Sequence, residues 1–373
     1  MDSKVERIKK WMEGKKRGPV RVELHPTDRC NLDCRFCWRK GDNEIRPEKE
    51  LSKDKLIDIV DEAADMGVEE WIISGGGEPM LRKETTLQVM ERIKEHGMWG
   101  QLTTNGCLLK EEDVERIVDM RWDQVQISID GPDARTHNFI RQEDYAFRKS
   151  VKASKMISSE KKRQESSNPY LGYNTIIHNR VHDKLEEMIV LADSAGSQLV
   201  YFEPIYPGYS SKVRLELDEG EKKEMVEHVD RAERLAEELD VDTNIGEYRE
   251  KYSIDKDSFG DRVIGKVQDN REGFLGAPCY QPWYLLGIKG SGLVGCCSTF
   301  EEGVYIHDRS LKEVWFSKKF QELREEMLEK DIPEYCSKCS VVVLKSNERI
   351  RKILSSGSLG LNGKLKEKIG EVF

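Results

Sequence analysis

The stretch Cys30-Asn-Leu-Asp-Cys34-Arg-Phe-Cys37 holds three thiols within eight residues, at a C-x3-C-x2-C spacing. It follows Val20–Leu24, which alternates like a strand and ends before Pro26. Three cysteines on one tight loop can each bind one iron of a cubane iron–sulfur cluster. A cubane has four irons, so this loop would leave one iron without a protein ligand and open to chemistry. The alternatives are unrelated thiols or a zinc site, although structural zinc usually takes four ligands from paired motifs.

Composition and charge indicate a globular protein of a reducing compartment. The 373 residues are 37% hydrophobic and 35% charged, enough for more than one domain with a large core. No apolar run reaches transmembrane length and no signal peptide precedes Val20, so we expect a cytoplasmic protein whose thiols stay reduced and bind metals. The net charge of −9 argues against nucleic acid as the main partner, because phosphate binding favours a basic surface.

Strand-like and helix-like segments alternate from Val20 to about Leu239. After the first strand, the expected strands are Glu70–Ser74, Gln101–Thr104, Gln124–Ile129, Tyr170–Ile177 and Leu199–Glu203. The expected helices are Asp54–Met66, Lys83–His96, Glu111–Met120, Tyr145–Ser158 and Asp183–Ala195. Such alternation predicts an α/β fold with a parallel sheet and right-handed crossovers. Six βα units are too few for a closed eight-unit barrel.

The cysteine motif, with the aromatic Phe36 before its last thiol, resembles the signature of the radical S-adenosylmethionine (SAM) superfamily. The resemblance implies a partial (β/α)6 TIM-like barrel and a [4Fe-4S] cluster on Cys30, Cys34 and Cys37. It implies that the open iron chelates SAM, which one electron splits into a 5′-deoxyadenosyl radical that takes hydrogen from a substrate. The cofactors supply this chemistry and the protein orients it. A flavodoxin or ferredoxin is the expected electron donor.

Motifs at the ends of later strands resemble SAM-binding positions of the family. Gly76-Gly77-Glu78 matches the GGE motif, whose backbone holds the methionyl amino group, and glycines permit a close approach. By the same resemblance, Arg141 binds the cofactor carboxylate, as a guanidinium can do with two hydrogen bonds. Asn105 at the barrel mouth, Ser128 and Asp130 near the ribose, and Ile177 at the adenine complete the expected cofactor site. A turn, a solvated helix charge or a core position remain the alternatives. Asn174 and Glu203 also end strands with polar side chains.

A second set of thiols lies near the C-terminus, at Cys279, Cys297, Cys336 and Cys339. The Cys-x12-Gly-x4-Cys run is followed after 38 residues by Cys-x2-Cys, which resembles the auxiliary-cluster extensions called SPASM and, when shortened, Twitch. No cysteine follows Cys339, so the resemblance implies one auxiliary [4Fe-4S] cluster. A four-cysteine zinc site is the alternative that this spacing permits. Cys296 competes with Cys297, because strand neighbours point to opposite faces and only one should be a ligand.

The C-terminal third predicts a small domain made of a hairpin and a helix. Trp283–Ile288 and Gly292–Val294 predict a hairpin, and Leu311–Glu329 predicts one helix. The expected divisions are a helical extension (1–19), a barrel (20–240), a linker (241–278), a SPASM-like or Twitch-like domain (279–343) and a basic tail (344–373). Short amphipathic runs in the tail predict a helix docked on the protein itself, with a membrane or partner contact as the alternative.

Together these features predict a radical SAM enzyme. An auxiliary cluster with four cysteine ligands has no open iron and suits passing an electron, which favours net oxidation of the substrate by dehydrogenation or cross-linking. The 19 residues before Val20 are too few for the leader-binding domain of many peptide-modifying relatives, so the expected substrate is a small molecule or a peptide that is recognised in another way. Modification of a ribosomally made peptide is the alternative. A non-catalytic iron–sulfur or zinc binding module is the alternative of another class.

Overall fold

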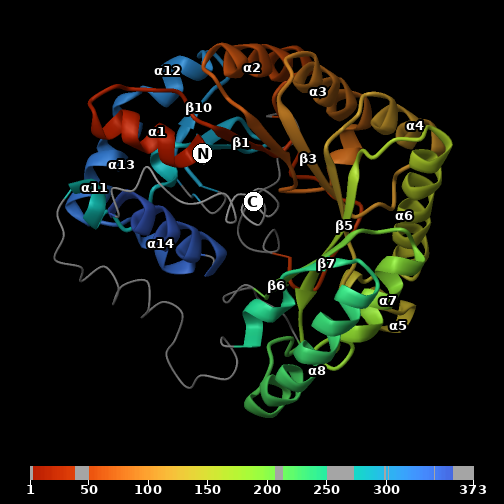
Figure 1. Ribbon diagram of the computed structural model, residues 1–373. Coiled ribbons are helices and arrows are strands. Elements are labelled where there is room, and N and C mark those ends of the chain that lie inside the picture. The colour runs from red at the N-terminus through yellow and green to blue at the C-terminus, as the bar shows by residue number, and fades with distance from the viewer. Residues whose placement is uncertain are drawn as a thin grey trace.

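A computed structural model describes residues 3–37, 50–205, 213–249, 273–297, 300, 302–339 and 341–355. Within these residues the chain forms a single ten-stranded sheet in the order β10-β9-β8-β1-β2-β3-β4-β5-β6-β7. The sheet curves, and helices line its outer side (Figure 1).

The first seven strands are all parallel. They are β1 (Arg21–Leu24), β2 (Glu70–Ile73), β3 (Trp99–Thr104), β4 (Gln124–Ser128), β5 (Tyr170–Ile177), β6 (Leu199–Pro204) and β7 (Asp242–Thr243). The helices between them are α2 (Lys53–Asp65), α3 (Lys83–Glu95), α4 (Glu111–Asp119), α6 (Ala146–Arg163), α7 (Leu185–Ser194) and α8 (Glu219–Glu238), with the short α5 (Ala134–Arg141) before α6. The predicted partial barrel of six βα units is confirmed. The helix predicted over Tyr145–Ser158 extends further, to Arg163.

Local sequence signals account for where these elements begin and end. The predicted N-cap of α2 is confirmed, since the Ser52 side chain accepts a hydrogen bond from the Lys55 amide. Gly67 follows that helix with φ +77°, a backbone region that favours glycine. The alternating apolar residues of β1, Val22 and Leu24, are fully buried in the main core. Burial of these side chains therefore fixes the position of β1 and of its carboxyl end.

The C-terminal hairpin extends the barrel sheet. The predicted hairpin is confirmed as β8 (Leu285–Ile288) and β9 (Leu293–Gly295), and β10 (Val304–Tyr305) pairs with β9. β8 also pairs with β1 in parallel, with Arg21 opposite Leu285. The sequence did not predict this pairing, which brings the second cysteine region to the edge of the barrel that carries the first.

The single helix predicted over Leu311–Glu329 is wrong. The structure has two helices there, α12 (Leu311–Trp315) and α13 (Lys318–Glu329). The Ser317 side chain accepts a hydrogen bond from the Phe320 amide, and this cap starts a new helix. The apolar periodicity runs through both helices, so it did not reveal the break.

The remaining described elements gather near the N-terminal helix. α14 (Val341–Ser355) packs against α1 (Ser3–Met12), and Ile350, Val5 and Ile8 share a second hydrophobic cluster (Figure 1). The described parts of the predicted linker hold β7, η4 (Ile245–Glu247) and α11 (Gly273–Gly276). Residues 250–272 of that linker and 356–373 of the predicted tail lie outside the described residues. No helix in the described part of the chain is both long and apolar enough to cross a membrane.

Candidate functional site

The first cysteine loop leaves the carboxyl end of β1 and is fastened to α5. Cys34 is buried, with 7% of its surface exposed, while Cys30 and Cys37 are partly exposed. The backbone amide of Arg35 donates to the Ile140 carbonyl at 2.9 Å, and Nε of the Arg35 side chain donates to the Phe139 carbonyl at 2.8 Å. The loop between the second and third thiols is therefore held by α5.

The glycine loop after β2 presses against the segment that leads into the cysteines. The Gly77 amide donates to the Thr27 carbonyl at 2.9 Å, and the Glu78 amide donates to the Arg29 carbonyl at 2.8 Å. A Cβ atom on Gly77 would lie 1.8 Å from the Arg29 oxygen, so no side chain fits there. The motif thus positions the cysteine loop through its backbone.

Glu78 is buried and ties β2 to the end of β3. Its carboxylate accepts hydrogen bonds from Thr104 Oγ1 at 2.6 Å, the Asn105 amide at 2.8 Å and the Met80 amide at 3.0 Å. Burial raises the pKa of Glu78, and these hydrogen bonds partly oppose that shift. Asn105 Nδ2 lies 2.9 Å from Asn31 Oδ1 and 3.9 Å from Cys30 Sγ, which brings Asn105 to the cysteine loop.

Arg141 and Asp130, both predicted to touch the cofactor, form a buried ion pair. Arg141 Nε lies 2.6 Å from Asp130 Oδ2, and Arg141 Nη1 lies 3.6 Å from Cys34 Sγ. The guanidinium also lies over the Phe36 ring, 5.4 Å from its centroid. Burial alone would lower the pKa of Arg141, but the charges of Asp130 and Cys34 raise it above its ordinary value. Arg141 therefore remains a cation beside the buried thiol.

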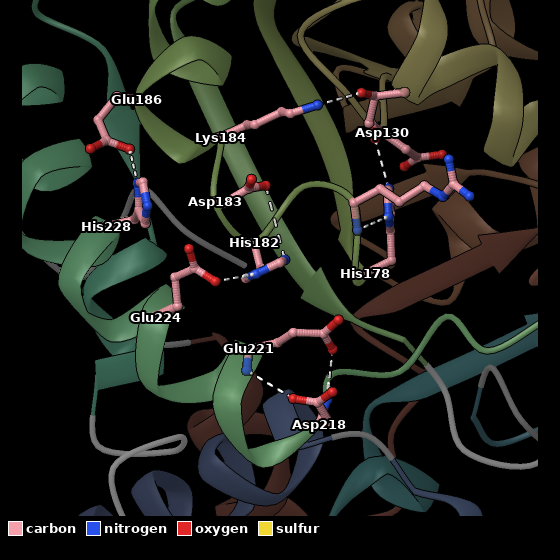
Figure 2. A network of polar contacts seen from close by, with 12 residues as sticks. Asp130, His178, His182, Asp183, Lys184, Glu186, Asp218, Glu221, Glu224 and His228 are labelled. Atoms are coloured by element: carbon pink, nitrogen blue, oxygen red, sulfur yellow. Dashed lines mark hydrogen bonds and ion pairs between the residues drawn. The ribbon is translucent and has the colours of Figure 1, made fainter.

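Two histidines hold the backbone of Asp130, and Figure 2 shows one of them, His178. The Asp130 amide donates to His137 Nδ1 at 3.1 Å, and His178 Nε2 lies 2.8 Å from the Asp130 carbonyl oxygen. Burial lowers the pKa of His137 to about 3, so its ring is neutral at pH 7. Sequence reasoning did not assign either histidine to the site. The spacing of His137 four residues before Arg141 puts them on one helix face and was the available signal.

The other predicted cofactor residues lie around this centre to different degrees. Ser128 ends β4 opposite Asn174, whose Nδ2 lies 3.3 Å from Glu203 Oε2. Burial raises the pKa of Glu203. Ile177 is 1% exposed in the main hydrophobic core, and the structure does not join it to the polar network of Asp130.

Other histidine–carboxylate pairs join α8 to α7 and its preceding turn. His182 Nε2 lies 3.1 Å from Glu224, and His228 Nδ1 lies 2.7 Å from Glu186 (Figure 2). Within the described residues, no three His, Cys, Asp or Glu side chains could hold a single metal ion. These pairs crosslink the two helices.

The second set of thiols converges from three segments. Cys279 precedes η5 (Gln281–Trp283), Cys297 follows β9, and Cys336 lies in η6 (Glu334–Lys338). Burial raises the pKa of Cys279 to about 11 and that of Cys336 to about 12, and the nearby charge of Cys297 raises both. The Cys339 amide donates to the Cys336 carbonyl at 3.1 Å. Burial and mutual repulsion thus oppose ionisation of these thiols, and a cationic iron–sulfur core would stabilise their thiolate forms.

Cys296 and Cys297 differ in their surroundings. Cys296 is 4% exposed and packs in the main hydrophobic core, whereas Cys279 and Cys336 pack on the cluster beside α1. The three thiols of Cys297, Cys279 and Cys336 still lie close enough to Cys296 to raise its pKa. Cys297 is partly exposed. Cys107, the remaining thiol, is buried with its Sγ 3.8 Å from both the Ala146 carbonyl and Ser150 Oγ.

Family comparisons match both cysteine regions. A model of the radical SAM superfamily matches residues 24–189, and a model of the SPASM iron-sulfur cluster-binding domain matches residues 279–340. The chain therefore contains a radical SAM domain over residues 24–189. It also carries a C-terminal SPASM domain.

Curated relatives include enzymes named for peptide and nucleotide chemistry. PqqA peptide cyclase of Granulibacter bethesdensis is 32% identical over 48% of this chain and 45% of that protein. A probable GTP 3′,8-cyclase of Methanothermobacter marburgensis is 34% identical over 35% of this chain and 41% of that protein. These matches span less than half of either relative. PqqA peptide cyclase of Methylocella silvestris is 25% identical over 80% of this chain and 74% of that protein.

Solved structures share the fold. Streptococcus suis SuiB, bound to its precursor peptide SuiA, matches with a TM-score of 0.62 at 16% identity, over 85% of this chain and 69% of SuiB. The enzyme anSMEcpe with bound AdoMet and a peptide matches with a TM-score of 0.59 at 17% identity, over 88% of each chain. At these identities the likeness supports the fold alone, a TIM-like barrel with a C-terminal SPASM domain.

Proposed function

We propose that this protein is a radical SAM enzyme that oxidatively modifies a peptide, with Cys30, Cys34 and Cys37 as ligands of its catalytic cluster. The observation that carries the proposal is the fastening of the cysteine loop from two sides, by the glycine loop after β2 and by α5. The hydrogen-bond donors around the cysteine loop fit an anionic, thiolate-bound iron–sulfur cluster. Arg141 faces Cys34 Sγ, and the Leu32 amide lies 3.5 Å from Cys30 Sγ. When bound, the cluster and SAM supply a 5′-deoxyadenosyl radical that takes hydrogen from the substrate.

In this proposal the surrounding residues orient the cofactor. The unpaired donors of Arg141 bind the SAM carboxylate, and Asp130 positions that guanidinium through their 2.6 Å contact. The backbone of Gly76 and Gly77 shapes the methionyl side. Asn105, Ser128 and Ile177 remain predicted contacts to the rest of SAM.

We further infer that Cys279, Cys297, Cys336 and Cys339 would hold one auxiliary [4Fe-4S] cluster. This cluster would accept one electron from the substrate radical, which would also lose a proton after the hydrogen abstraction. Cys297 is the preferred ligand over Cys296, because Cys296 is packed in the apolar core. The named activities of the PqqA peptide cyclases and the SuiA-bound SuiB favour a peptide over a small molecule. The product would then be a peptide lighter by two hydrogens, as in a cross-link or a dehydrogenation.

The test of the catalytic site replaces all three loop cysteines by Ala. We expect loss of about four irons per chain, retention of about four at the second site and no 5′-deoxyadenosine from SAM under dithionite. Cys107→Ala is the control for loss of a thiol that is not a proposed ligand: it packs against α6 in the same small apolar cluster as Cys34, and its loss should leave the iron content and the 5′-deoxyadenosine formation unchanged. Persistent SAM cleavage in the triple variant would contradict the assignment. Mass spectrometry of peptides coexpressed with the enzyme tests the substrate class, and a small-molecule product with no change in any peptide would reject it.

A further inference from the structure

We propose that a cluster of arginines around Phe139 is the docking surface for an acidic protein that delivers the single electron required by the catalytic cluster. The inference rests on the proposed function, since only an enzyme that must be reduced needs such a surface. We define the arginine surface as Arg35, Arg135 and Arg180 together with Phe139.

A surface cavity of about 690 Å³ opens at α5 beside the cysteine loop. Its lining includes Arg35, Arg135, Asn138, Phe139, Gln142 and Asp144. Arg135 and Arg180 are exposed, and the Phe139 ring carries two guanidinium groups. The Arg35 guanidinium lies 4.4 Å and the Arg180 guanidinium 3.5 Å from the ring centroid. These contacts hold the two cations beside the cavity while leaving hydrogen-bond donors free for a ligand.

The arginine surface is positive in an otherwise acidic protein. Among the residues that the structure describes, none of its three arginines forms an ion pair with a carboxylate; of the other exposed arginines of the barrel helices, Arg163 and Arg231 form one, whereas Arg148 and Arg234 do not. Asp144 in the cavity lining and the nearby exposed Asp33 offset part of this charge. Among the described residues that line the cavity, two arginines and one aspartate are charged, so this lining is positive on a chain with a net charge of −9. A partner drawn to this site must therefore present acidic side chains.

The position beside the cysteine loop points to a redox partner in particular. Arg35 lies between Cys34 and Cys37, and its backbone and side chain are bonded to Ile140 and Phe139. On the same helix, Arg141 Nη1 lies 3.6 Å from Cys34 Sγ. The rate of electron transfer falls steeply as the distance between donor and acceptor grows, so a carrier must dock close to the cluster. A carrier docked on the arginine surface would thus be separated from the cluster only by the width of α5.

The proposed step transfers one electron from the carrier to the catalytic cluster. The carrier is oxidised by one electron and the cluster is reduced by one, and no bond forms or breaks. Redox encounters of this kind use small interfaces and rely on charge steering, so that the oxidised carrier can leave quickly. A few arginines around one aromatic ring match that requirement better than a large apolar interface.

The test uses charge reversal at exposed positions away from the cysteines. Arg135→Glu, Arg180→Glu and the double variant are compared with Arg234→Glu, an exposed arginine on α8 without an ion pair in the described residues. Glu at position 135 lies in the first turn of α5, where the helix dipole favours an anion, so folding should survive. Circular dichroism and iron content check this, and Arg135→Gln with Arg180→Gln provides a milder pair.

Two readouts are measured with an acidic flavodoxin as the probe. One is its direct binding at low and high salt, and the other is 5′-deoxyadenosine formation driven by reduced flavodoxin or by dithionite. We expect the double variant to lose about tenfold in both flavodoxin readouts at low salt, with the difference shrinking at high salt. Dithionite-driven cleavage and the Arg234→Glu control should match the parent.

Outcomes separate this proposal from the proposed function. Unchanged flavodoxin binding in the double variant, or no binding by the parent at low salt, would overturn the docking surface. Binding of flavodoxin to the parent enzyme is also measured in millimolar inorganic phosphate and in chloride of equal ionic strength. Weaker binding in phosphate than in chloride would instead indicate a site for a small anion. Absence of dithionite-driven cleavage in the parent would reject the enzyme, while the binding readout would still decide the surface.

Discussion

At the scale of single residues, the Asp130–Arg141 pair is the most sensitive contact of the site. Both side chains are buried, with 0% of Asp130 and 9% of Arg141 exposed. Asp130→Asn leaves a buried cation without its counter-ion, so we expect the free energy of unfolding to fall by about 3–5 kcal/mol. Urea denaturation under anaerobic conditions measures this.

A matched control for that variant lies three residues away. Asp133→Asn changes a half-buried carboxylate 3.6 Å from Lys184, and Asn still caps α5. Its effect should stay below about 1 kcal/mol. Equal losses in the two variants would show that the buried pair contributes no more than a surface contact.

His137 predicts an acid sensitivity. Its folded pKa of about 3 lies well below the ordinary value of 6.5, because burial and the nearby Arg141 disfavour the charged ring. The unfolded chain therefore binds more protons below pH 6.5, and stability present above that pH is lost as the pH falls towards 3. His137→Asn keeps a side-chain acceptor and should reduce this loss by roughly 1.4 kcal/mol per pH unit below pH 6. Urea denaturation between pH 4.5 and 7 tests this, and an unchanged pH slope would contradict it.

Some of these residues could be predicted from the sequence and others could not. Cys30, Cys34 and Cys37 are adjacent along the chain, so their spacing alone indicates a shared ligand. Asp130 and Arg141 were singled out, yet only the fold shows that they bind each other. His137 and His178 act through a backbone group of Asp130, and contacts of that kind leave little trace in residue spacing.

At the scale of elements, the contact between the glycine loop and the cysteine loop depends on missing side chains. Gly77→Ala would force a Cβ to within 1.8 Å of the Arg29 oxygen, so the two loops must separate. We expect loss of iron from the first site and a destabilisation of about 1–3 kcal/mol or more. Iron analysis and thermal unfolding measure the two effects.

Gly97→Ala separates backbone strain from crowding. Gly97 has φ +70°, and among the described residues no heavy atom beyond its own chain neighbours lies within 4 Å of the point that a Cβ would occupy. Its substitution therefore costs only the strain of that backbone region, about 1 kcal/mol. Iron content should be unaffected. Full iron loading in Gly77→Ala would show that the loops can adjust.

Arg324 joins α13 to the N-terminal helix and to the hairpin region. Its guanidinium lies 4.7 Å from the Trp11 ring and 4.4 Å from the Trp315 ring, and Nε donates to the Pro282 carbonyl at 2.9 Å. Burial lowers its pKa to about 10, which still leaves it charged at pH 7. Arg324→Ala should cost about 3–5 kcal/mol by leaving a cavity and an unpaired carbonyl group.

Lys318→Ala on the same helix is the control for that variant. The Lys318 side chain is 91% exposed, so its loss should change stability by less than about 0.5 kcal/mol. Chemical denaturation of both variants compares them. A small effect at Arg324 would mean that α1 and α13 are held by apolar packing alone. The sequence predicted a helix here but not its break at Ser317, because the apolar periodicity continues through that local cap. It did not reveal the buried Arg324 either, because its partners Trp11 and Pro282 are distant in the sequence.

At the scale of the whole molecule, the two sets of thiols divide the proposed reaction. Hydrogen abstraction needs only the first cluster and SAM, whereas completing an oxidation needs an exit for the electron. Cys336→Ala with Cys339→Ala removes two thiolates and should prevent the second cluster from assembling. We expect this variant, once circular dichroism shows it folded, to form 5′-deoxyadenosine but little oxidised product. Normal product from folded protein that lacks the second cluster would leave that cluster a structural role.

The pairing of β1 with β8 has a consequence for synthesis on the ribosome. β1 emerges early, but the strand that covers its free edge emerges about 260 residues later, which takes roughly 10–50 s at ordinary elongation rates. During that interval β1 offers unpaired backbone groups to any other nascent chain. Slow translation or a shortage of chaperones should therefore reduce the yield of soluble protein before any cofactor is inserted.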